Sequence, residues 1–376
     1  MWRHVLLCCF VFLMVGCKAT NIKSFEAGDE IEAKTKGENR LWFQADKFDT
    51  AMQKGRQIPD LPKIKVYLQE IMDRLYPEFK GHIKVDLHRA PVLNAFALPN
   101  GSIYINLGML ASLENEAQIA SVLAHEGIHF LQKHSAKQRI YNQNSQGWAL
   151  AVSMIGIPLA GQLVAMNSIS GYSQEHETEA DNLGFERLRK AGYATSEATR
   201  AFEILAREVK ANDIDEPYFF ASHPKLQERI GNFKTLNADL TDQTKGEIGF
   251  ERYQSIVGGI RVPVIKEKLA AGRVNAVLAT LEDQGAERIY QDRLNFLKAL
   301  ALLKKADDAS SDKAEQLLIA EVEKKPQFAE AHKALGFHFI KRKQNELAKN
   351  HLEQYLKFAS ATADTAFAEY YLKKMQ

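Results

Sequence analysis

Two histidines four residues apart, His125 and His129, enclose an acidic residue in the segment His-Glu-Gly-Ile-His. In a helix, side chains four residues apart project from one face, so both imidazoles can bind a single metal ion. Catalytic zinc takes three protein ligands and keeps a fourth position for water, whose proton a nearby carboxylate accepts. The segment therefore predicts a zinc-dependent hydrolase, with His125 and His129 as ligands and Glu126 as general base.

The residues around the histidines predict a helix with one buried flank. Asn115 and Gln118 form a capping pair that indicates its start. Gly127 costs about 1 kcal/mol relative to alanine inside a helix, so the close approach of a facing strand or helix is expected there. Apolar residues recur at helical spacing on the flank beside the histidines: Ile119, Val122, Leu123, Ile128 and Leu131. The alternative is an ordinary solvated helix, because the same pattern also occurs without a metal.

A third ligand is expected from the acidic segment 175–181. If this segment is helical, Glu177 and Asp181 share a face with small and apolar residues, whereas Glu175 and Glu179 point outward with Glu186. Glu177 is therefore the predicted third ligand. Asp181, one turn later, is expected to accept the second N–H of a ligating histidine and so fix its ring. His176 and His134 are expected at the surface.

Three blocks of the sequence carry a resemblance to a known family. The first block, before the histidine helix, is Asn-Ala-Phe-Ala-Leu-Pro-Asn-Gly at 94–101. The second, after that helix, contains Glu177 and Asp181. The third consists of Ser-His-Pro at 222–224 and Glu-Arg-Ile at 228–230. From about residue 55 to about residue 235, the chain resembles the metallopeptidase family of CAAX proteases and HtpX, most of all its periplasmic, BepA-like branch. The resemblance implies a zinc endopeptidase with one zinc ion per chain.

The same resemblance assigns roles to two residues further along the chain. His223 is expected to reach the metal site, where it would occupy the open coordination position or stabilise the tetrahedral intermediate. Arg229 would serve an oxyanion or hold an acidic ligand. The alternative for His223 is a loop-capping role.

The predicted peptidase domain, residues 56–238, has an α+β fold of the gluzincin type, mainly helical with a small β-sheet. A helix is expected at 62–75, and strands at 83–88, 94–98 and 102–107, the last two joined by a turn that contains Asn-Gly. The resemblance makes the second strand the one that pairs with substrate, through Asn94, Ala95, Phe96 and Ala97. The alternative is a structural hairpin. His82 and His88 are expected to be surface or packing residues.

The uncharged segment 140–174 separates the two halves of the predicted site. One membrane crossing would put His125 and Glu177 on opposite sides, and two crossings need more apolar residues than the segment contains. We expect a helical hairpin or flap, interrupted at Gly-Ile-Pro 156–158 and packed near the cleft.

The first 16 residues have a short basic head and an apolar run of signal-peptide length. Met-Val-Gly-Cys at 14–17 is similar to a bacterial lipobox, which implies cleavage before Cys17 and its lipidation; the alternative is an uncleaved anchor or an ordinary secretory leader. Lys18 replaces the aspartate associated with inner-membrane retention, so attachment to the periplasmic face of the outer membrane is expected. All three cysteines lie within residues 1–17, which excludes disulfides and a cysteine nucleophile downstream. Residues 17–55 are expected to form a polar tether with one helix.

Length and composition predict two folded domains. The chain has 376 residues, 45% of them hydrophobic and 26% charged, with a net charge of +2 and no basic stripe, so nucleic-acid binding is not expected. Residues 249–376 are helical in pattern, and the segments at 312–318 and 346–352 match at an offset of 34 residues, the tetratricopeptide period. We expect an all-α tetratricopeptide-like domain that offers a surface to protein partners. A purely stabilising solenoid is the alternative.

These observations and the resemblance predict a lipid-tethered periplasmic zinc metalloendopeptidase. The resemblance implies that its substrates are misfolded or misassembled envelope proteins. The expected partners are polypeptide substrates, envelope proteins or assembly machinery bound by the helical repeats, and the membrane through lipid on Cys17. The alternative is a non-proteolytic periplasmic chaperone or assembly factor that keeps a structural zinc and acts through its repeats.

Overall fold

The structure, a computed structural model, describes residues 22–141, 172–212, 223, 225–240, 246–305, 307–361 and 363–375. The predicted signal peptide and the lipidation site at Cys17 lie outside the described residues. So does most of the predicted flap at 140–174, of which only the two ends are described. No helix in the described part of the chain is both long enough and apolar enough to span a bilayer.

The sheet has three strands, β1 (Lys84–His88), β2 (Ala95–Ala97) and β3 (Ser102–Asn106), in the order β1-β3-β2. β1 runs parallel to β3, and β2 pairs antiparallel with β3 with Phe96 opposite Tyr104. Gly101 has φ +89° in the β2–β3 turn, a backbone region that favours glycine. The three predicted strands are confirmed, and β2 is an edge strand of this sheet.

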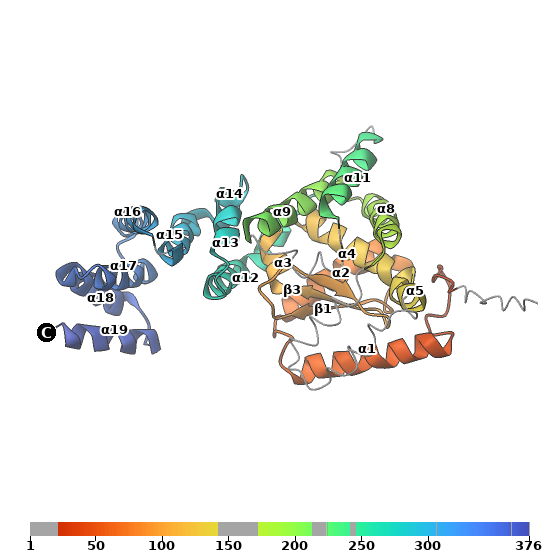
Figure 1. Cartoon of the computed structure of the whole chain (residues 1–376), viewed down its shortest axis with the longest axis horizontal. Helices are drawn as coiled ribbons and strands as arrows, with labels where there is room; N and C mark the ends of the chain where they lie inside the picture. The colour runs from red at the N-terminus through yellow and green to blue at the C-terminus, as the bar shows by residue number, and fades with distance from the viewer. Residues whose placement is uncertain are drawn as a thin grey trace, which may run out of the picture.

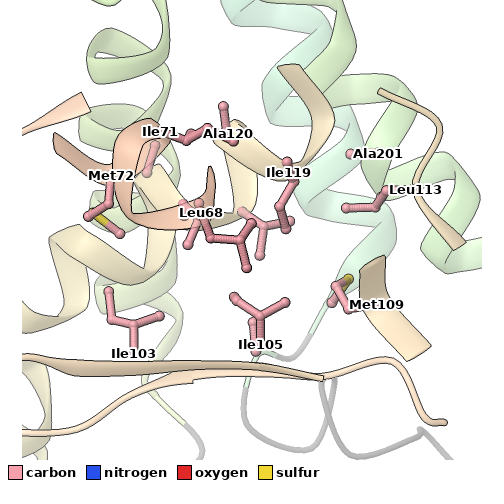
Figure 2. Close-up of a cluster of buried hydrophobic side chains, with 14 of the residues drawn as sticks. Leu68, Ile71, Met72, Ile103, Ile105, Met109, Leu113, Ile119, Ala120 and Ala201 are labelled. Carbon is pink, nitrogen blue, oxygen red and sulfur yellow. The ribbon is translucent and has the colours of Figure 1, made fainter. Parts of the chain in front are cut away.

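Among the described residues, seven helices complete the predicted peptidase part of the chain, together with a 3-10 turn, η1 (Pro77–Phe79). They are α2 (Pro62–Leu75), α3 (Leu107–Ser112), α4 (Glu116–Leu131), α5 (His134–Tyr141), α8 (Gln174–Lys190) and α9 (Ser196–Asn212), followed by α11 (Leu226–Ala238). All 16 residues of α4 are buried, because α2, the sheet, α8 and α9 pack around it. Figure 2 shows this core, in which Leu68 and Met72 of α2 and Ile119 of α4 lie over Ile103 and Ile105 of β3. The α+β, mainly helical fold is thus as predicted.

Helix α1 (Lys36–Lys54) lies within the segment expected to be a tether. It runs along the sheet on the side away from α4 (Figure 1). Ala45, Phe48 and Met52 of α1 pack against Phe96 and Tyr104. The one helix expected within residues 17–55 is thus present, and it packs on the second face of the sheet, which the expectation of a polar tether did not include.

The C-terminal part is entirely helical among its described residues. It comprises α12 (Phe250–Ala270), α13 (Val274–Leu281), α14 (Ala286–Tyr290), η3 (Gln291–Arg293), α15 (Leu294–Lys305), α16 (Asp308–Lys324), α17 (Ala329–Lys341), α18 (Asn345–Phe358) and α19 (Ala363–Lys374). Helices α15 and α16 pack as one pair and α17 and α18 as the next, and the pairs extend away from the peptidase part (Figure 1). Ala314 and Ala348, which are 34 residues apart, are both fully buried in these pairs.

Helix α12 contributes to two cores. Tyr253, Val257 and Val264 pack in the core of the peptidase part, while Ile265 and Leu269 pack with the helices that follow. The side chain of Lys268 ends between Glu208 of α9 and Ser112 of α3, at 2.7 and 2.9 Å. The expected second domain, 249–376, therefore begins with a helix that the peptidase core also requires.

Candidate metal centre

Helix α4 presents His125, Glu126 and His129 on a buried surface. The Asn115 side chain accepts a hydrogen bond from the backbone N–H of Gln118, so the predicted cap is confirmed. A Cβ on Gly127 would lie 2.4 Å from the Tyr76 ring, whose hydroxyl donates to the carbonyl of Ala124. The close approach at Gly127 is thus made by this aromatic ring.

Helix α8 crosses α4 at a glycine and places its acidic residues beside the histidines. A Cβ on Gly184 would approach the backbone N of His125 to 3.1 Å, so the two helices are already close to contact at this point. Glu177 and Asp181 are buried, and Glu175 is exposed. The predicted helical phase of α8 is correct for these three residues.

Four side chains converge so that their donor atoms all lie within 4.8 Å of one another: His125, His129, Glu177 and His223. His125 Nε2 is 2.9 Å from His129 Nε2 and 3.2 Å from His223 Nδ1. Glu177 Oε1 is 3.0 Å from His223 Nδ1 and 3.3 Å from His129 Nε2. Zinc–nitrogen bonds of about 2.0–2.1 Å in a tetrahedron separate the donors by about 3.3 Å. The geometry and the chemistry of this donor set fit a zinc ion.

A buried arginine holds the acidic residues of α8 in place. Asp181 Oδ1 lies 2.9 Å from His125 Nδ1. Arg229 donates to Asp181 over 2.7 Å, and its Nη1 lies 2.9 Å from Glu177 Oε2. Asp181 thus lies where a carboxylate would orient His125. Arg229 contacts both acidic residues, and its Nη2 also lies 3.2 Å from His125 Nε2.

Glu126 is fully buried, and neither of its carboxylate oxygens has a hydrogen-bond partner among the described residues. Its Oε1 lies 3.4 Å from His223 Nε2. A buried carboxylate without donors is costly unless a further group binds there. This position therefore fits a carboxylate that handles a water or a substrate proton beside the four donors.

The electrostatics of the site favour a negative Glu177 and a neutral His129, whereas they favour the protonated form of His223 in the absence of a metal. Burial alone would raise the pKa of Glu177, but the neighbouring His223 and Arg229 hold it well below its usual range. Burial and the adjacent His125 keep the pKa of His129 well below that of a free histidine. Burial also acts to lower the pKa of His223, but Glu177 and Glu126 outweigh it and raise that pKa. A carboxylate and a neutral imidazole are the protonation states that bind a metal cation.

Two neighbours of His129 were not anticipated as part of the site. His134, expected at the surface, is fully buried, and its Nδ1 lies 2.8 Å from Nδ1 of His129. This correction has a clear cause: Lys133 has φ +53° and ends the helical path, so the phase of α4 does not extend to His134. Tyr172 stacks on His129, with the ring centroids 3.8 Å apart. No motif in the sequence marks Tyr172.

Edge strand β2 lies next to α4 and close to the donor set. Ala97 and Leu98, at the end of β2, line a small pocket together with His129 and with Leu41 and Trp42 of α1. The predicted substrate strand thus ends beside one of the histidines, and α1 forms one wall there. Asn94, immediately before β2, is buried, and its Oδ1 has no partner in the described part of the chain.

The other histidines of the described residues lie outside the four-donor cluster. His82 is exposed, and His88 is buried with its Nδ1 2.8 Å from Asn106 Oδ1. In the C-terminal helices, His332 and His338 are buried packing residues.

The fold and the donor set together define the peptidase part of the chain as a metallopeptidase domain. The model of Peptidase family M48 matches residues 62–237 of the chain. All four donors and Glu126 lie inside the matched region.

The chain is also similar to proteins described as metalloendopeptidases or proteases. A mitochondrial metalloendopeptidase of Schizosaccharomyces pombe is 27% identical over 46% of this chain and 53% of its own length. A putative beta-barrel assembly-enhancing protease of Vibrio cholerae is 26% identical over 75% of this chain and 60% of its own length. The beta-barrel assembly-enhancing protease of Escherichia coli is 26% identical over 37% of this chain and 31% of its own length. The chain therefore spans less than two thirds of the curated relatives it matches.

Proposed function

We propose that the protein is a zinc metalloendopeptidase, with His125, His129 and Glu177 as the protein ligands of a single zinc ion. The observation that carries this proposal is the buried Glu126 carboxylate, which accepts no hydrogen bond from the described residues and lies directly beside a donor set of tetrahedral spacing. A purely structural zinc site has no use for such a carboxylate, because its four ligands complete the coordination.

Bound zinc would supply Lewis acidity, which polarises the scissile carbonyl and acidifies the attacking water. Glu126 would take the proton of that water and deliver it to the leaving amine. Asp181 would hold His125 through its Nδ1–H, and Arg229 would fix Asp181 and Glu177 at their spacing. Arg229 is thus assigned a holding role and not that of an oxyanion donor.

We propose that His223 occupies the fourth coordination position in the conformation described here. Its Nδ1 is 3.0–3.2 Å from donor atoms of Glu177 and His125, as a fourth tetrahedral ligand requires. Water and a substrate carbonyl need that position, so His223 has to leave it before cleavage. Once displaced, it remains close enough to the site to stabilise a developing negative charge.

The substrate would be an extended polypeptide that adds to the free edge of β2. Main-chain pairing with residues 94–97 tolerates many sequences, which suits an enzyme acting on misfolded or misassembled chains. The names of the bacterial relatives support a role in the assembly of envelope β-barrel proteins. We place the protein in the bacterial periplasm, attached through lipid on Cys17 to the outer membrane, with the C-terminal helix pairs as tetratricopeptide-like repeats that recruit envelope proteins or assembly machinery.

The test is metal content together with hydrolysis of an unfolded outer-membrane β-barrel protein, with and without a chelator. The wild type should bind one zinc ion per chain and lose cleavage on chelation. Glu126→Gln should keep zinc and lose cleavage by several orders of magnitude, because it removes the base and leaves the ligands intact. Cleavage by Glu126→Gln at the wild-type rate would refute the assigned base. Assembly activity that survives in a cleavage-dead Glu126→Gln protein would favour the chaperone alternative.

A further inference from the structure

A chain of hydrogen-bonded side chains leads from His129 to the protein surface. His129 Nδ1 faces His134 Nδ1 at 2.8 Å, and His134 Nε2 faces Glu179 Oε2 at 2.9 Å. His134 is fully buried, whereas the Glu179 side chain on α8 is 41% exposed. Glu179 was expected to point away from the site, and it reaches the site only through His134.

The carboxylate at the outer end of this chain sets the proton positions along it. Glu179 can only accept, so His134 must donate from Nε2. A neutral His134 then has a bare Nδ1, which accepts from the Nδ1–H of His129. His129 is left with a lone pair on Nε2, the atom that faces the other donors. The opposite tautomer of His129 would present an N–H to the metal and could not bind it.

The two histidines of α4 are thus oriented in different ways. His125 Nδ1 faces Asp181 directly, inside the buried cluster. His129 is oriented through the intervening imidazole of His134. Tyr172 stacks on the His129 ring and so limits rotation of that ring about its Cβ–Cγ bond. His134 also stacks on His176, with centroids 4.3 Å apart, which holds the intervening ring in its plane.

We propose that His134 and Glu179 are positioning residues that fix the tautomer and ring orientation of His129 for zinc binding. This inference rests on the proposed function, because it takes His129 to be a zinc ligand. Without His134, the Nδ1–H of His129 has no acceptor, and the tautomer that exposes Nε2–H to the metal becomes accessible. Without Glu179, His134 can reverse its own tautomer and donate toward His129, with the same consequence for the ligand.

The experiment measures zinc affinity by competition with a chromophoric chelator, and the visible absorption of the cobalt-substituted protein. Loss of a residue that orients a metal ligand typically weakens metal binding about 10–100-fold. His134→Ala should fall in that range and shift the cobalt bands. Glu179→Ala should weaken zinc binding several-fold with a smaller band shift. Glu179→Gln should restore most of the affinity, because its amide oxygen still accepts from His134.

Glu175→Ala is the matched control, since Glu175 is an exposed acid one turn before Glu179 on the same helix. It should change zinc affinity less than twofold. Wild-type affinity and an unchanged cobalt spectrum in both His134→Ala and Glu179→Ala would overturn the proposal. If His134→Ala fails to fold, the partly exposed Glu179 variants decide alone. Failure of the proposed function would appear differently, as a wild-type protein that binds no zinc or binds zinc without cleaving peptides.

Discussion

Replacing Gly127 with alanine should destabilise the protein, although alanine is the better helix former. The new Cβ would lie 2.4, 2.6 and 2.8 Å from Cε2, Cζ and the hydroxyl oxygen of Tyr76. The Tyr76 ring is buried, and its hydroxyl is bonded to the Ala124 carbonyl, so it cannot swing away without losing that bond. The helix that would have to move instead carries His125 and Glu126.

The magnitude follows from two opposing terms. Overpacking a tight core costs about 1–3 kcal/mol, and a contact this short against a ring that is held in place belongs in the upper half of that range. Alanine in place of a helical glycine returns about 1 kcal/mol. The net loss in the free energy of unfolding should therefore be about 1–2 kcal/mol.

The assay is urea unfolding at saturating zinc, with Gly231→Ala as the matched control. Gly231 lies inside α11 with nothing within 4 Å of a Cβ, so the same change there should stabilise by up to about 1 kcal/mol. In a Tyr76→Leu background, Gly127→Ala should cost at least about 1 kcal/mol less, because the ring is gone. Equal effects at positions 127 and 231, or the same cost with and without the Tyr76 ring, would refute the reasoning.

Two further predictions concern histidines. His223→Ala should leave zinc bound by three protein ligands. It should raise the initial rate of peptide cleavage severalfold, if occupation of the fourth coordination position limits turnover. A chelator-sensitive rate below that of the wild type would show that His223 contributes more to catalysis than to inhibition. The C-terminal helices should lose stability as the pH falls from about 6.5 to about 4, because burial and the adjacent His332 lower the pKa of His351 in α18 to about 4. Between these pH values His351 is protonated in the unfolded chain and neutral in the folded protein. His351→Gln should therefore flatten the pH dependence of thermal unfolding, and an unchanged slope would contradict this prediction.

The sequence predicted the parts of the site that depend on local periodicity. Residues four apart on a continuous helix lie on the same face, which correctly pairs His125 with His129 and Glu177 with Asp181. The Asn115 cap marks the residue at which α4 begins. The β2–β3 hairpin follows from alternation around a turn with Asn-Gly.

The missed features depend on contacts between distant segments. His134 follows a left-handed residue, Lys133, which breaks the helical phase on which the expectation of a surface position was based. Lys133 itself is buried against Glu38 of α1, 95 residues earlier, and no periodic pattern reveals such an ion pair. The polar composition of residues 17–55 likewise conceals the apolar face of α1 that packs on the sheet.

The position of α12 has a consequence for how the two parts of this protein are connected. A helix whose residues up to Val264 complete one core and whose residues from Ile265 onward begin the next is not a hinge, and Lys268 is held between Glu208 and Ser112 at 1% exposure. A cargo bound along the distal helices would thus be presented to the catalytic cleft at a set distance and angle. If the outer helices bind substrate as proposed, the distance between the bound region and the metal centre would determine which segment of the substrate is cleaved.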